Sequence, residues 1–168
     1  MKDNLKRITK EVIPFIIIVA IVLLIKQFVI TPVQVSGDSM YSTLKNGDIM
    51  ILNKVGYKLA GLRRFQIVVV DNKDNLLIKR VIGLPGETIK YENNKLYVNG
   101  VETEEYFLSS DTVTNDFEVV VGEDCYFLMG DNRRVSLDSR ELGCFNLDRI
   151  QGTTSITLFP FSRFGGKS

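Results

Sequence analysis

Three short segments carry the residue types that a hydrolytic site needs, in a chain of 168 residues without histidine. They are Ser36-Gly37-Asp38-Ser39-Met40, the stretch from Lys79 to Gly86, and the stretch from Gly130 to Arg140. A serine hydroxyl becomes a good nucleophile only when a neighbouring base takes its proton, and imidazole, the usual base, is missing. The combination indicates Ser39 as a nucleophile and Lys79 as its base.

Lys79 can serve as a base only if its pKa is lowered. It follows Leu76-Leu77-Ile78 and precedes Val81 and Ile82 in a β-rich run, and full burial lowers a lysine pKa by up to about 3–5 units. Taken singly, both residues have ordinary alternatives, because Ser39 fits a surface turn and Lys79 fits the exposed face of a strand.

The third segment favours the catalytic interpretation. Its carboxylates, Asp131 and Asp138, can pair with Arg80 and Arg140 to form a rigid scaffold, and its Ser136 hydroxyl can orient a neutral lysine amine. A calcium loop is the alternative for such Asp-rich sequence. It fits poorly, because three arginines add positive charge and no glutamate stands at the spacing of a bidentate ligand.

The elements that must position these residues are short strands. Runs rich in β-branched and aromatic residues are bounded by Gly, Asn and Asp, and Asn99-Gly100 predicts a tight hairpin within residues 95–101. The other strands are expected at 49–52, 65–70, 76–78, 119–121 and 154–159, with no sustained helical periodicity after residue 31. The predicted fold class is a mainly β, antiparallel domain over residues 31–168.

Before this domain lies a 19-residue apolar segment, Val12 to Ile30, interrupted only by Lys26 and Gln27. At about 1.5 Å per residue it nearly spans a hydrocarbon core of roughly 30 Å. We expect one transmembrane helix at 12–30, with Pro14 in its first turn. The basic excess in residues 1–11 predicts a cytoplasmic tail and an extracytoplasmic remainder. A cleaved secretory signal, which lacks a small-x-small site here, and a buried soluble helix are the alternatives.

Composition excludes several classes of function. The 21 basic and 20 acidic side chains nearly cancel, so no nucleic-acid partner is expected. Cys125 and Cys144 cannot build a metal site by themselves, and we expect neither metal nor cofactor. The two cysteines either form a disulfide outside the cell or, as we favour, remain separate, with Cys125 a small buried apolar residue.

The chain resembles the bacterial type I signal peptidases, membrane-anchored Ser–Lys proteases that remove signal peptides. The resemblance rests on the apolar anchor, on the nucleophile segment Ser36–Leu44 followed by Gly47–Met50, on Lys79–Glu87, and on Gly130–Arg140. The closing run 159–165 is also similar. The resemblance implies that Ser39 is the nucleophile, Lys79 the general base and Ser136 the hydroxyl that hydrogen-bonds the lysine. It further implies signal-peptide-bearing preproteins and membrane lipid as partners.

Some positions depart from the family pattern. Gly37 stands where the Gram-negative branch has a serine that donates to the oxyanion, which leaves the Ser39 amide as the identified donor. This glycine and the single anchor resemble the Gram-positive branch. Ser42 replaces a usual proline, Glu87 replaces a usual aspartate, and residues 141–145 replace an aromatic-rich continuation.

The substrate is expected to add as an extended strand between residues 33–37 and the strand ending at Lys79. The resemblance implies small side chains one and three positions before the scissile bond, with Val35, Met40, Leu44 and Ile78 as pocket walls. An ordinary core is the alternative for these four residues. Two other functions stay open: a self-cleaving repressor-type protease, and a specialised or inactive membrane-tethered module that binds secreted proteins.

Overall fold

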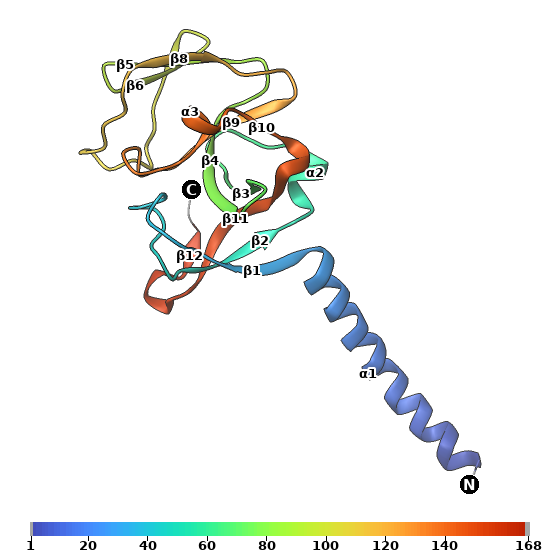
Figure 1. Cartoon of the computed structure of the whole chain (residues 1–168). Coiled ribbons are helices and arrows are strands. Elements are labelled where there is room, and N and C mark those ends of the chain that lie inside the picture. Colours follow the sequence, from blue (N-terminus) through green and yellow to red (C-terminus); the bar gives the residue numbers. More distant parts are fainter. Residues whose placement is uncertain (1, 167–168) are drawn as a thin grey trace.

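The computed structural model describes residues 2–166, with the backbone alone described for residues 2–9 and 24–28. Within this range the strands form two antiparallel sheets, and after α1 every helical segment is short, so the predicted mainly β, antiparallel fold is confirmed. A helix of 27 residues, α1 (Lys2–Phe28), projects away from the β body, and the smaller sheet lies at the opposite end (Figure 1).

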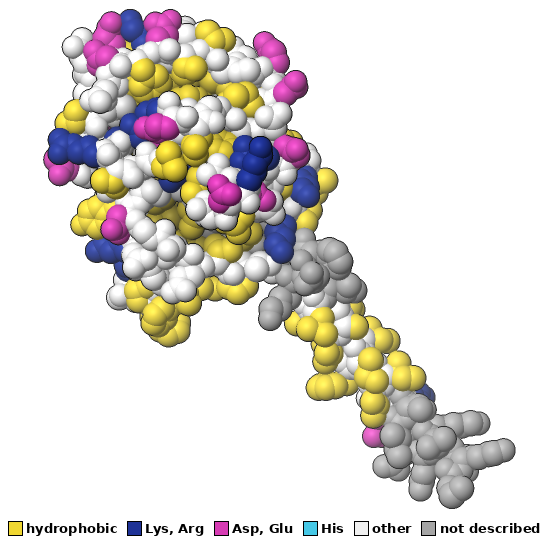
Figure 2. All heavy atoms as spheres, viewed as in Figure 1, with side chains coloured by type: hydrophobic (Ala, Val, Ile, Leu, Met, Phe, Trp, Pro, Cys, Tyr) yellow, Lys and Arg dark blue, Asp and Glu magenta, His cyan; other side chains and the backbone are white. Residues whose placement is uncertain are grey.

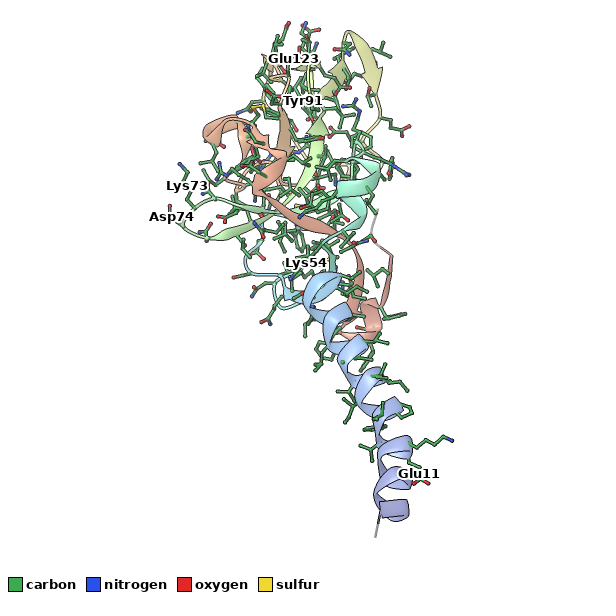
Figure 3. The ribbon with its side chains drawn as sticks, turned by 90° about the vertical axis from the view of Figure 1, so that its right-hand side faces the viewer. Glu11, Lys54, Lys73, Asp74, Tyr91 and Glu123 are labelled. Atoms are coloured by element: carbon green, nitrogen blue, oxygen red, sulfur yellow. A yellow bond between two sulfur atoms is a disulfide. The ribbon has the colours of Figure 1, made fainter. Side chains whose placement is uncertain are left out.

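The larger sheet contains the strand that carries Lys79 and the strand that leads into Gly130–Arg140. Its neighbours in order are β1 (Ile30–Gln34), β2 (Ile49–Asn53), β11 (Ile150–Phe159), β3 (Ile67–Asp71), β4 (Leu76–Gly83), β9 (Cys125–Met129) and β10 (Phe145–Asn146), and β12 (Gly165–Gly166) pairs with β11. Strand β1 pairs only with β2 and is therefore an edge. Strands β3 and β4 form a hairpin whose tip carries Lys73 and Asp74 (Figure 3).

The smaller sheet has the order β7 (Val101–Thr103), β6 (Lys95–Val98), β5 (Thr88–Glu92) and β8 (Phe117–Val120). Asn99 and Gly100 join β6 to β7 with φ of 50° and 82°. Two successive positive φ values are the signature of a type I′ turn, which Asn-Gly favours. The predicted hairpin is confirmed.

Short helical segments connect the strands in the described part of the chain: α2 (Gly56–Ala60), α3 (Ser139–Leu142), η1 (Leu147–Arg149) and η2 (Phe161–Arg163). Each has five residues or fewer, too few to produce a helical period in the sequence. Asp138 caps α3, since it accepts from the Arg140 amide while Glu141 reaches back to the Asp138 amide.

Helix α1 differs in its bounds from the predicted segment. It begins ten residues earlier, so Pro14 lies inside the helix rather than in its first turn, and it ends at Phe28, so Ile30 already belongs to β1. Part of the predicted segment, residues 24–28, lies outside the side chains that are described. Among the residues described in full, no helix has both the length and the hydropathy required to cross a bilayer.

Cys125 and Cys144 form a disulfide, contrary to the favoured expectation of separate cysteines. Their Cα atoms are 5.6 Å apart, within the usual range for a disulfide. Cys125 opens β9, and Cys144 lies between α3 and β10, the short strand that pairs with β9. The pairing of β9 with β10 thus brings together two cysteines that sequence patterning could not align. The bond closes a loop that contains the whole of Gly130–Arg140.

Candidate active site

Ser39 lies in the turn that follows β1 and is partly buried. The turn is closed at its base by hydrogen bonds from the Val35 amide to the Asp48 carbonyl and from the Gly47 amide to the Val35 carbonyl, 2.8 and 2.9 Å. Met40 and Leu44 are buried in one cluster with Val35, against which Ile78 packs. The apolar side chains on either side of Ser39 therefore fix the turn to the sheet.

The predicted pocket residues belong to this same cluster. Val35, Met40 and Leu44 are at most 3% exposed, and Ile78 is partly buried. They form continuous apolar packing directly under the Ser39 turn and beside β4. Their assignment as pocket walls stays a prediction.

Lys79 lies in β4, opposite Val68 of β3, and is 2% exposed. Burial lowers its pKa from 10.5 to about 8, and the nearby carboxylate of Asp138, which favours the ammonium form, only partly offsets this. Among the described residues, no hydrogen bond or ion pair holds its amine. The amine can therefore be neutral near physiological pH and free to accept a proton.

Gly130 connects these two residues. The register pairs Arg80 of β4 with Met129 of β9, so the next ladder position places Gly130 beside Lys79. A Cβ built on Gly130 would lie 2.4 Å from the Ser39 carbonyl oxygen and 2.2 Å from Ser136 Oγ. The Ser39 backbone and the Ser136 side chain thus lie against the glycine that the register places beside Lys79, although the three residues are far apart in the sequence.

Ser136 contributes a buried hydroxyl. It is 6% exposed, and its Oγ makes no hydrogen bond of good geometry with a described residue, although the hydroxyl lies close enough to the Asp138 carboxylate to help lower the pKa of Asp138. Buried hydroxyl groups nearly always find a partner, so an unpaired one beside a buried lysine marks a position where a proton can be shared.

A buried ion pair between Arg80 and Asp131 helps to hold the residues around Gly130 in place. Arg80, fully buried, donates from Nε and Nη2 to the two carboxylate oxygens of Asp131 at 2.9 and 2.7 Å. Its Nη1 donates to the Phe65 carbonyl at 2.8 Å, and its guanidinium stacks on the Phe107 ring, 3.8 Å from the centroid. Thr43 completes the network by donating to Asp131 Oδ2 at 2.6 Å.

A second ion pair joins Arg140 to Asp138. Arg140 Nε and Nη2 donate to the Asp138 carboxylate at 2.8 and 2.9 Å, and the Gly130 amide donates to Asp138 Oδ2 at 2.9 Å. Burial acts to raise the pKa of Asp138, but these hydrogen bonds outweigh it and hold the pKa below its ordinary value. Asp138 therefore stays ionised and fixes the backbone of Gly130.

Sequence reasoning missed three contributors. The Asn132 amide donates to the Ser39 carbonyl at 3.0 Å, and its side-chain amide donates to the Asp38 carbonyl at 3.2 Å, so Asn132 holds the nucleophile turn. Arg133, 3% exposed, donates to the Gly130 carbonyl and to Glu105 at 3.1 and 2.5 Å, which ties the site to the segment between the small-sheet strands β7 and β8. Thr43 is the third. All three lie within the segments Ser36–Leu44 and Gly130–Arg140, but no spacing rule identifies their hydrogen-bond partners.

Comparison with known proteins gives the family. Residues 8–159 match the model of the family described as signal peptidase, peptidase S26. Signal peptidase IB of Staphylococcus aureus (strain COL) is 38% identical, covering 92% of this chain and 93% of its own. Signal peptidase I S of Bacillus subtilis (strain 168) is 40% identical, covering 88% and 86%.

A solved structure agrees with this result. The crystal structure of a signal peptidase I from Enterococcus faecalis V583 superposes with a TM-score of 0.50 at 34% identity, covering 55% of this chain and 95% of that one. The chain belongs to the signal peptidase family, peptidase S26.

Proposed function

We propose that this protein is a membrane-anchored serine endopeptidase that removes N-terminal signal peptides from secreted preproteins. The observation that carries the proposal is the buried Lys79, whose pKa is about 8, in the ladder position beside Gly130, the same glycine against which the Ser39 carbonyl and the Ser136 hydroxyl lie. Membership of the signal peptidase family supports the substrate class.

In the proposed reaction Ser39 Oγ attacks the carbonyl carbon of the scissile peptide bond while neutral Lys79 takes the hydroxyl proton. The Ser39 amide donates to the oxyanion that forms. The lysine then gives its proton to the departing amine as the carbon–nitrogen bond breaks, which leaves the signal peptide esterified to Ser39. In the second half, Lys79 takes a proton from water, the resulting hydroxide attacks the ester, and the proton returns to Ser39 Oγ.

We assign Ser136 to orienting the lysine amine, because its hydroxyl is buried without a partner at the glycine that Lys79 adjoins. Two ion pairs act as the scaffold. Arg80, the residue after Lys79 in β4, pairs with Asp131. Asp138, which pairs with Arg140, accepts a hydrogen bond from the Gly130 amide and so fixes Gly130. At position 37 there is no side chain to supply a second oxyanion donor, and its amide donates to Asn46 Oδ1 at 3.1 Å.

The unpaired strand edges support substrate binding by strand addition. On one side of β4, residues 76–78 pair with β3. On the other side, β9 pairs with β4 only from Arg80 onward. The outer edge of β1 also lacks a neighbour among the described strands. An extended signal-peptide segment between these edges would lay alternate side chains over the cluster of Val35, Met40, Leu44 and Ile78. Because this apolar cluster packs directly under the Ser39 turn, a substrate segment lying over it has room only for small side chains.

We further propose that the chain comprises a cytoplasmic tail, a single membrane span ending near residue 28, and an extracytoplasmic β domain. The described side chains of α1, residues 10–23, are all exposed and mostly apolar, and they cover the helix on the face shown in Figure 2. An apolar helix without a protein partner is stable in lipid rather than in water. Lys54, near the end of α1 in Figure 3, donates its amide to the Val29 carbonyl at 3.0 Å, so the helix leads directly into the catalytic sheet.

Cleavage of a preprotein by the detergent-solubilised protein tests this function. The wild type should release the signal peptide, and Ser39→Ala and Lys79→Ala should each abolish release. The controls are Ser110→Ala and Lys73→Ala, two exposed positions that should retain full activity. A wild type that cuts no preprotein would favour the inactive binding module, and equal cutting by Ser39→Ala would exclude the proposed dyad.

A further inference from the structure

A cavity of about 150 Å³ adjoins the nucleophile turn. Three segments line it: the first contributes Tyr41 and Ser42, the second is the arm between the small-sheet strands β7 and β8, and the third is residues 131–134. The arm contributes Ser109, Asp111, Thr112 and Val113. Most of the lining side chains are polar or charged. The cavity is therefore chemically unlike the apolar cluster beneath the Ser39 turn.

The cavity is continuous with the reacting centre. Tyr41 and Ser42 follow Ser39 by two and three residues, and Asn132 both lines the cavity and donates to the Ser39 carbonyl. The acyl side of the substrate is assigned to the residues that precede Ser39 and to the free edge of β4. The chain beyond the scissile bond must then leave on the opposite side, across Tyr41, Ser42 and Asn132.

The charges of the cavity are unequally satisfied. Asp131 is held by Arg80, and Arg133 by Glu105. A hydrogen bond from the Ser109 hydroxyl holds the pKa of Asp111 below its ordinary value, and the charge of Arg134 contributes.

Arg134 is exposed and makes no hydrogen bond or ion pair with any residue the structure describes. Lys45 lies over the ring of Tyr41, 5.9 Å from its centroid, and adds a second cation at this rim. A guanidinium has five donor hydrogens that match a carboxylate.

We propose that this cavity receives the first two residues of the mature chain after the scissile bond, and that Arg134 favours an aspartate or glutamate side chain there. Arg134 acts as a specificity residue, outside the bond-breaking machinery. The inference rests on the proposed signal-peptide cleavage and extends it to the leaving side of the substrate.

The test uses the full-length detergent-solubilised protein and one preprotein with Asp, Ala or Lys at each of the first two mature positions. The readout is the ratio of kcat/KM for the Asp substrate to that for the Lys substrate, so a general change in activity cancels. Exposed ion pairs contribute modestly, and we expect a wild-type ratio of about fivefold. Arg134→Gln should bring the ratio near one, and Arg134→Glu should invert it.

Arg63→Glu is the matched control, because it makes the same charge reversal at an exposed arginine outside the cavity and should keep the wild-type ratio. The inference is overturned if Arg134→Glu retains the wild-type ratio, or if Arg63→Glu shifts it equally. Failure of the wild type to cut any of the substrates would refute the proposed function instead, so the two failures are distinguishable.

Discussion

Replacing Gly130 with alanine tests whether the convergence of Ser39, Ser136 and Lys79 is needed for catalysis. The added Cβ would lie 2.2 Å from Ser136 Oγ and 2.4 Å from the Ser39 carbonyl oxygen. Ser136 can rotate its hydroxyl away, but its Cβ, 2.5 Å from the added atom, and the Ser39 carbonyl oxygen can move only with the backbone. The nucleophile turn, the loop after β9, or both must therefore move.

The size of the effect follows from these distances. An ordinary contact for Cβ begins at 3.4 Å, so the atoms must separate by about 1 Å. A misplacement of about 1 Å in an active site costs roughly 100-fold in rate. We expect kcat to fall by about that factor and KM to change less, because the substitution displaces the reacting groups rather than residues 76–78, which are proposed to pair with the substrate. Overpacking should also reduce the free energy of unfolding by about 1–3 kcal/mol.

Steady-state cleavage of a preprotein gives kcat and KM, and urea unfolding followed by circular dichroism gives the stability. Gly166→Ala is the control, since a Cβ there would meet nothing closer than 3.9 Å. Its kcat should equal that of the wild type. If folded Gly130→Ala protein keeps more than half of the wild-type kcat, the geometric argument for the site is wrong.

Three further substitutions probe the scaffold. Asp131→Asn leaves the buried guanidinium of Arg80 without its carboxylate and should cost about 3–5 kcal/mol in urea unfolding, a loss below 1 kcal/mol being inconsistent with this pair. Replacing Cys125 and Cys144 together by serine should lower the free energy of unfolding by about 3 kcal/mol relative to the oxidised protein, and equal stability would refute a role for the disulfide. Ser136→Ala removes a hydroxyl without a described partner, so kcat should fall about 100-fold with stability within roughly 1 kcal/mol. An unchanged kcat would exclude the orienting role.

Much of the β architecture could be predicted because its signals are local. The Asn99-Gly100 dipeptide sets a hairpin by its own backbone preference, and the apolar run at 65–70 became β3. Strands β1, β5, β9, β10 and β12 were missed. β1 directly continues the apolar segment and contains Pro32, which strands tolerate mainly at edges, while β5 alternates apolar and polar residues in only five positions.

The candidate site likewise combines features that local sequence predicts with features that depend on the tertiary structure. The types of Ser39, Lys79 and Ser136 pointed to their chemistry, but their meeting at Gly130 depends on the register between β4 and β9, which no short window encodes. The disulfide has the same origin, because the pairing of β9 with β10 brings Cys125 to Cys144. The partners of Asn132 and Arg133 likewise arise from tertiary packing alone.

The pH dependence of kcat/KM tests the role of Lys79 most directly, because this parameter reports ionisations of the free enzyme. A lysine base works only when neutral, and burial lowers the pKa of Lys79 to about 8. We predict that kcat/KM for preprotein cleavage rises about tenfold per pH unit below this value and levels off above it. A profile that is flat or falls between about pH 6 and pH 9 would contradict a lysine base and with it the proposed Ser39–Lys79 dyad.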